Sequence, residues 1–210
     1  MQNKLRTVAR ALLLGVLGVT FCMVAFGIVP VARAQAAGAP AAWGLPQLMQ
    51  SLSQVKSSRA HFVERKYLSI VNTPLEYTGG LAYTAPDRLE KRTETPKAES
   101  MILEGERLTL ENARKQRRVV MLSEYPVVRA FVESIRSTLG GDLQTLNRYY
   151  RVSLEGQPGA WQLLLVPSEP SMQAVVREIR IEGADTHLKS IEIIEKEGDR
   201  SVMRITEVAP

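Results

Sequence analysis

Two histidines and one cysteine are the side chains of this 210-residue chain best suited to base or nucleophilic catalysis. His61 and His187 lie in or at the start of predicted strands, and no neighbouring motif indicates a catalytic role. Cys22, the only cysteine, falls in an apolar N-terminal stretch. The rest of the chain can therefore form no disulfide, Cys-ligated metal site or cysteine nucleophile.

The acidic residues are spread evenly and suggest no catalytic pair. Glu104/Glu106 and Glu195/Glu197 are more simply interpreted as solvated hairpin ends than as a glycosidase dyad. The chain also has no Gly-rich phosphate loop, His-Glu-x-x-His helix, Gly-x-Ser-x-Gly elbow or Cys/His cluster. The sequence predicts no metal and no cofactor and disfavours an enzyme, although residues distant in sequence can still converge.

One short segment is strongly basic and separates two predicted strands. It places four bases in five residues, namely Arg114, Lys115, Arg117 and Arg118. One interpretation is a solvated hairpin tip that protects a sheet edge. The other is a contact for anionic lipid headgroups or for an acidic patch on a membrane partner.

The overall charge of +5 does not indicate a nucleic-acid-binding protein. Four bases and no acid lie in residues 1–34, whereas residues 35–210 carry 23 Lys and Arg against 22 Asp and Glu. The excess of positive charge therefore belongs to the leader, and no nucleic-acid partner is expected.

Residues 1–34 have the pattern of a secretory signal peptide. A basic start precedes the apolar stretch from Ala11 to Val29, and Ala32-Arg33-Ala34 offers a cleavage site. The 19-residue apolar stretch also leaves an uncleaved membrane anchor open. Bulky Phe21 before Cys22 argues against lipidation. We expect a signal peptide at 1–34, a linker at 35–42, and one folded domain at 43–210.

Hydrophobic spacing predicts a mainly β domain of α+β type. Helices are expected over Leu45 to Val55, Tyr125 to Leu139 and Asp142 to Tyr149. Strand-length segments run over 59–69, 77–84, 88–95, 99–103, 108–112, 119–123, 151–155, 161–166, 175–182, 188–196 and 201–208. These elements predict a large, curved or rolled antiparallel sheet with helices against one face.

The middle helix is the candidate for a movable segment. Val128, Phe131, Ile135 and Leu139 form one apolar stripe, and chain breaks at Tyr125-Pro126 and Gly140-Gly141 bound the helix. Periodicity leaves open whether the space under this stripe is packed solid or is a cavity.

Across residues 43–208, this order of segments resembles the outer-membrane lipoprotein carrier family, LolA. The resemblance rests on Ala60-His61-Phe62-Val63-Glu64, Gly80-Leu81-Ala82-Tyr83, Pro86-Asp87-Arg88-Leu89, Pro96, Glu104-Gly105, Leu108, and the run from Trp161 through Gly183, Asp199 and Arg200. It implies an unclosed antiparallel β-barrel, or half-barrel, of about ten strands with two or three helices covering an apolar cavity.

The resemblance also implies a function and a site. A periplasmic protein of a Gram-negative bacterium would carry acyl chains of lipoproteins or lipids from an inner-membrane release complex to an outer-membrane acceptor, as a monomer. Strand parity and family position together give eight candidate residues for the cavity and its lid: Phe62, Leu81, Tyr83, Leu89, Val128, Phe131, Ile135 and Trp161.

Two departures from the family pattern favour a divergent, LolA-like carrier. Ala85 stands where the family has the Arg that holds the lid shut, so that latch is either missing or made elsewhere. The chain also ends at Val208-Ala209-Pro210, before the further strand usual in the family. A lipid-sensing regulatory module, and an acyl hydrolase or transferase using His61 or His187, are the alternative functions.

Overall fold

In the computed structural model, residues 43–208 are described. The expected signal peptide, the linker and Cys22 lie outside this range. The elements are α1 (Leu45–Leu52), β1 (Ser57–Tyr67), β2 (Leu75–Thr84), β3 (Arg88–Thr95), β4 (Glu99–Glu104), β5 (Arg107–Glu111), β6 (Arg117–Met121), the 3-10 helix η1 (Leu122–Glu124), α2 (Pro126–Leu139), α3 (Leu143–Tyr149), β7 (Tyr150–Gln157), β8 (Ala160–Pro167), α4 (Pro170–Gln173), β9 (Val176–Ala184), β10 (His187–Glu195) and β11 (Arg200–Glu207).

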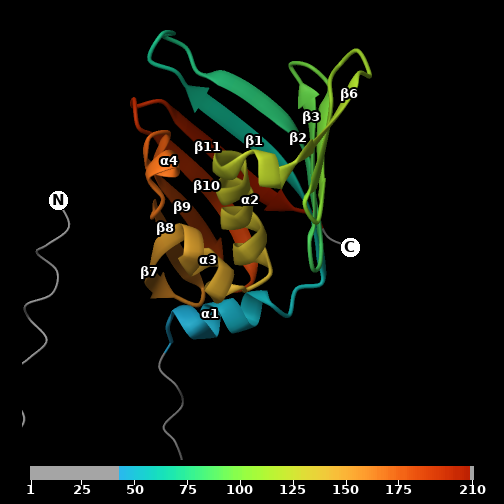
Figure 1. Cartoon of the computed structure of the whole chain (residues 1–210). Helices are drawn as coiled ribbons and strands as arrows, with labels where there is room; N and C mark the ends of the chain where they lie inside the picture. Colours follow the sequence, from blue (N-terminus) through green and yellow to red (C-terminus); the bar gives the residue numbers. More distant parts are fainter. Residues whose placement is uncertain (1–42, 209–210) are drawn as a thin grey trace, which may run out of the picture. The chain divides into compact units, whose positions relative to one another are not determined.

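The eleven strands form one antiparallel sheet that does not close. Its order is β6-β5-β4-β3-β2-β1-β11-β10-β9-β8-β7, so β1 and β11 pair at the centre and β6 and β7 form the edges. The sheet curves around α2, which lies in its hollow, while α1 lies across one end (Figure 1). This confirms the predicted mainly β, half-barrel fold, and every predicted strand segment contributes a strand.

Alternation along the strands determines the inner face. In β1, Ala60, Phe62 and Glu64 are buried while His61 and Val63 are exposed, as the period of two requires. Strands β8 and β9 alternate in the same way. Polar residues on the outer face therefore stay in water, and one curved apolar surface faces the helices.

The buried residues form two clusters with α2 between them. The larger cluster joins α1 and the β7–β11 half of the sheet, and it includes Leu48, Leu146, Leu165 and Ile179. The smaller consists of Leu103, Leu108, Leu122 and Val132, from β4, β5, η1 and α2. The interior is thus divided along the middle of the sheet.

Helix boundaries differ in detail from those predicted. Helix α1 begins after Gly44 with Pro46 in its first turn and ends at Leu52, so Val55 follows the helix. Asp142 caps α3 by accepting a hydrogen bond from the Thr145 amide at 2.9 Å, as its position predicts. The break predicted near Pro170 contains the short helix α4. None of the helices within 43–208 combines the length and the apolarity that a membrane crossing requires.

Candidate functional site

An apolar cavity of about 200 Å³ lies between the concave face of the sheet and α2. Strands β1 to β5 supply one wall, and β10 and β11 supply the other. Members of both buried clusters line it, including Leu103, Leu108 and Val132 from the smaller one and Leu188 and Ile191 from the larger one. The cavity therefore occupies the gap between the two halves of the interior.

Helix α2 covers the cavity with its large side chains and packs elsewhere with its small ones. Phe131, Ile135 and Leu139 line the cavity and are only half-buried. The fully buried face carries Ala130, Ser134, Ser137 and Thr138. Hydroxyls within this face are satisfied inside the helix, because Ser134 donates to the Phe131 carbonyl and Thr138 to the Ser134 carbonyl, both at 2.6 Å.

Two arginines of α2 bind the β4–β5 turn. Arg129 donates to a Glu106 carboxylate oxygen at 3.1 Å, and Arg136 donates to the Gly105 carbonyl at 2.8 Å. Arg136 also pairs with buried Glu133 on its own helix. Ala85 lines the same polar cleft as these groups. Helix α2 is thus attached to the β4–β5 turn through its own arginines, and the methyl side chain of Ala85 can donate no hydrogen bond to it.

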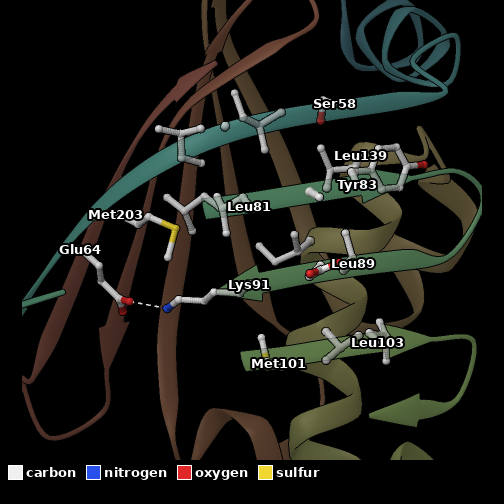
Figure 2. A pocket seen from close by; sticks show the side chains of 18 of the residues that line it. Ser58, Glu64, Leu81, Tyr83, Leu89, Lys91, Met101, Leu103, Leu139 and Met203 are labelled. Atoms are coloured by element: carbon white, nitrogen blue, oxygen red, sulfur yellow. Dashed lines mark hydrogen bonds and ion pairs between the residues drawn. The ribbon is translucent and has the colours of Figure 1, made fainter. Parts of the chain in front are cut away.

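One charged cluster lies inside the cavity. Glu64 on β1 is 5% exposed and accepts hydrogen bonds from Lys91 Nζ at 2.5 Å and Ser201 Oγ at 2.7 Å. All three residues line the cavity, and Figure 2 shows Lys91 reaching from β3 toward Glu64. The Lys66 ammonium lies 3.6 Å from the other side of the same carboxylate. We call Glu64, Lys91 and Ser201 the polar cluster.

The polar cluster keeps Glu64 ionised. Burial alone raises the pKa of this carboxyl, but the charge of Lys91 and the hydrogen bonds from Lys91 and Ser201 outweigh it and hold the pKa below the ordinary value of 4.5. At neutral pH the cavity therefore contains an ionised carboxylate.

Five of the eight sequence-predicted residues come together at the cavity: Leu81, Tyr83, Leu89, Phe131 and Ile135. Figure 2 shows Leu81, Tyr83 and Leu89 pointing into it from β2 and β3. Sequence reasoning missed Lys91 and the lining residues of β10 and β11, such as Ile191 and Met203. Strand parity offered one signal for Lys91, which lies two residues after Leu89 and on the same face.

Phe62, Val128 and Trp161 do not line this cavity. The Phe62 ring is fully buried, lies over Gly79, and is covered by the Lys91 ammonium 4.8 Å from its centroid. The Trp161 indole fills the space over Gly183 and donates to the Asp185 carbonyl at 2.9 Å. Val128 is 37% exposed, in the first turn of α2.

The four basic residues lie at the tip of the β5–β6 hairpin. Lys115 and Arg117 pair with Glu111 at 3.2 and 2.7 Å, and hydrogen bonds from Arg117 and then Lys115 lower the pKa of that exposed carboxyl. Arg117 and Arg118 already belong to β6, which begins two residues earlier than predicted. The tip carries four bases and one acid, so its net charge is positive.

The two histidines lie on β1 and β10, the strands on either side of β11. His61 is exposed on the outer face of β1, and His187 Nδ1 lies 2.5 Å from a Glu207 carboxylate oxygen at the start of β10. Neither histidine contacts a hydroxyl group among the hydrogen bonds of residues 43–208. Within the same residues, no three His, Cys, Asp or Glu side chains are grouped so that they could hold a metal ion.

Residues 37–209 match a family model described as outer membrane lipoprotein carrier protein LolA-like. No curated protein matches the chain.

Three solved structures are similar to this chain. A LolA superfamily protein from Nitrosomonas europaea is 10% identical, with 80% of this chain and 95% of that one covered and a TM-score of 0.44. A putative outer membrane lipoprotein-sorting protein domain from Vibrio parahaemolyticus is 8% identical, with coverages of 78% and 90% and a TM-score of 0.40. A chain of the Pseudomonas aeruginosa MucA/MucB complex is 12% identical, with coverages of 79% and 58% and a TM-score of 0.47.

Proposed function

Because the chain belongs to the LolA-like family of outer membrane lipoprotein carrier proteins, we propose that it binds acyl chains of lipoproteins or lipids in the cavity under α2. It carries them through the periplasm, as a monomer, from an inner-membrane release complex to an outer-membrane acceptor. Export by the N-terminal 34 residues brings the 43–210 domain to that compartment.

The apolar cavity under α2 is the observation that carries this proposal. Exposing a sixteen-carbon chain to water costs about 13 kcal/mol at about 0.8 kcal/mol per methylene, so acylated cargo needs a cover between the membranes. Leucine, isoleucine and methionine side chains supply that cover without directional bonds. Such a surface accepts hydrocarbon and still allows it to leave.

The size of the cavity requires α2 to move during loading. About 200 Å³ exceeds the roughly 150 Å³ of cavities that admit benzene and is smaller than the roughly 300 to 1,000 Å³ of pockets for drug-sized ligands. It therefore accepts part of one acyl chain. A complete chain enters when α2 moves away from the β4–β5 turn, which also exposes Phe131 and Ile135 to the incoming cargo.

The test compares two tryptophan substitutions on α2. Ile135→Trp fills the cavity, whereas Val128→Trp adds the same side chain at an exposed position of the same helix. We expect the purified wild-type protein and Val128→Trp to retain intact acylated lipid in mass spectra. Ile135→Trp should retain at least about tenfold less, because it removes the space for several methylenes.

Two results would contradict the carrier proposal. Wild-type protein free of lipid and unable to bind a fluorescent fatty acid would argue against a lipid-binding cavity. Hydrolysed acyl ester in the same preparation would instead favour the acyl hydrolase.

A further inference from the structure

The polar cluster lies at one end of the cavity. The cavity therefore has a charged end and an apolar end. Strand β1 runs from Ser58 and Ala60, near α1, to Glu64 further along. Figure 2 shows Ser58 at one side of the cavity, close to α1, and Glu64 with Lys91 at the other. An amphiphile matches this arrangement when its tail lies toward Leu52 and Leu139 and its polar group lies at the cluster.

Two bases approach one acid at the charged end of the cavity. Lys91 and Lys66 both approach the single carboxylate of Glu64, at 2.5 and 3.6 Å. Glu90, which also borders the cavity, pairs with Arg88 and Arg92. The other bordering carboxylate, Glu207, is bound to His187 near the end of β11 that is remote from Ser201. Of the two bases at Glu64, Lys91 lines the cavity and Lys66 lies outside its lining.

The hydrogen-bonding groups of the cluster favour the same kind of ligand. Both oxygens of Glu64 already accept hydrogen bonds, from Lys91 and from Ser201. The Lys91 ammonium carries three N–H groups, and within residues 43–208 its only hydrogen-bond acceptor is Glu64. The Lys91 ammonium therefore has N–H groups left to donate to a ligand.

We propose that the polar cluster is a subsite for an anionic group at the end of an acyl chain, either the carboxylate of a free fatty acid or the phosphate of an acidic lipid. Lys91 donates to the anion, and Glu64 holds the ammonium in position. This inference rests on the proposed function, since it names the class of lipid that the same cavity selects. A hydrogen bond between two charged groups is stronger than one between neutral groups, and it forms here beside buried Phe62, largely away from water.

The test measures affinity for three ligands with the same sixteen-carbon tail. Palmitate and hexadecyl phosphate are anionic, and methyl palmitate is neutral. At pH 7 we expect wild-type protein to bind an anionic ligand about 10- to 100-fold more tightly than the ester. A preference for palmitate over hexadecyl phosphate identifies a carboxylate subsite, and the reverse identifies a phosphate subsite.

Variants at Lys91, Glu64 and Lys189 test whether Lys91 causes the preference. Lys91→Met is expected to abolish it while leaving affinity for methyl palmitate within about twofold of wild type. Lys189→Met is the matched control, because Lys189 lies exposed on the outer face of β10. Glu64→Gln should strengthen anion binding, because the carboxylate no longer competes for the ammonium. If Lys91→Met does not fold, the double variant Glu64→Gln/Lys91→Met removes both charges and should show the same loss.

The possible failures are distinct. Equal affinity of wild-type protein for palmitate, hexadecyl phosphate and methyl palmitate would overturn the anionic subsite and leave the carrier proposal standing. A preference that survives in Lys91→Met or in the double variant would also overturn it. Failure of all three ligands to bind would contradict the carrier proposal itself.

Discussion

The Glu64–Lys91 pair shows how strand alternation can carry a charged residue into an apolar interior. The same period of two that buries Ala60 and Phe62 also buries Glu64. Its partner comes from β3, 27 residues later in the chain, and Ser201 comes from β11. Parity in the sequence therefore predicts the face of Glu64, but only the strand order β3-β2-β1-β11 brings its partners to it.

This pair should make stability depend on pH at acidic values. Because the pKa of Glu64 lies below 4.5 in the folded protein, the unfolded chain takes up the proton more readily. The stabilisation is fully present above about pH 4.5, the ordinary value, and is lost as pH falls through the folded pKa. At pH 7 we expect Glu64→Gln to lower the free energy of unfolding by about 1–3 kcal/mol, because Lys91 loses its charged partner.

Urea unfolding at steps from pH 7 to pH 3 measures this effect. The difference between wild type and Glu64→Gln should narrow below pH 4.5. Glu155→Gln, an exposed change on β7, should cost less than about 0.5 kcal/mol at any pH. A wild-type advantage that stays constant down to pH 3 would contradict the assignment.

Residue type alone did not separate cavity-lining positions from packed ones. Phe62 shares the inner face with Ala60, yet Gly79 leaves a space that its ring fills, and Lys91 covers the ring. Gly183 does the same for Trp161, since a Cβ there would lie only 2.1 Å from the indole. Both rings fill space over glycines of neighbouring strands. Which glycine lies beside which ring depends on how the strands are aligned, and residue type does not reveal that alignment.

At the scale of elements, the sequence predicts more about strands than about the role of the middle helix. Each predicted strand is present. Its alternating hydrophobic residues and the turn residues at its two ends are local features that the sequence shows directly. The sequence also predicts that the apolar stripe of α2 forms one face of the helix, and three of its residues, Phe131, Ile135 and Leu139, line the cavity together. However, the adjacent face, which carries mostly small residues, is buried more deeply, and the periodicity of large apolar residues does not reveal this.

The contacts between α2 and the β4–β5 turn should control how often the helix opens. Glu106→Gln removes the charge that accepts from Arg129 without altering the helix. Because Arg129 and Glu106 are each 38% exposed, the pair contributes only about 0.5–1 kcal/mol. We expect amide hydrogen exchange over residues 126–139 to become about two to five times faster.

Glu104→Gln is the matched control for this prediction. Glu104 ends β4 and pairs with Arg88 rather than with α2, so exchange in the helix should stay as in wild type. Equal acceleration in both variants would mean that the whole hairpin has loosened. No acceleration in Glu106→Gln would mean that Arg136, through the Gly105 carbonyl, holds the helix alone.

At the scale of the whole folded unit, the antiparallel order brings the charged features to one end. Strands β1, β3 and β5 run in the same direction, so the β1–β2 and β5–β6 turns lie at the end toward which β1 carries Glu64 (Figure 1). The four-base tip of β5–β6 is one of these turns, while α1 lies across the opposite end. A carrier that met a membrane with this end would present the charged end of its cavity to the lipid.

Binding to anionic vesicles tests this orientation. Changing Arg114, Lys115, Arg117 and Arg118 together to Ser should weaken binding at least about tenfold, because each base contributes about 1 kcal/mol near a charged surface and Glu111 already engages two of them. The loss should shrink as salt is added, because salt screens exposed charges. The control variant makes the same change of charge at four exposed residues of β7, β9, β10 and β11, namely Arg151, Arg177, Lys189 and Arg204. If both variants lose affinity equally, net charge rather than the hairpin tip drives binding, and if the tip variant binds as wild type does, the membrane contact lies elsewhere.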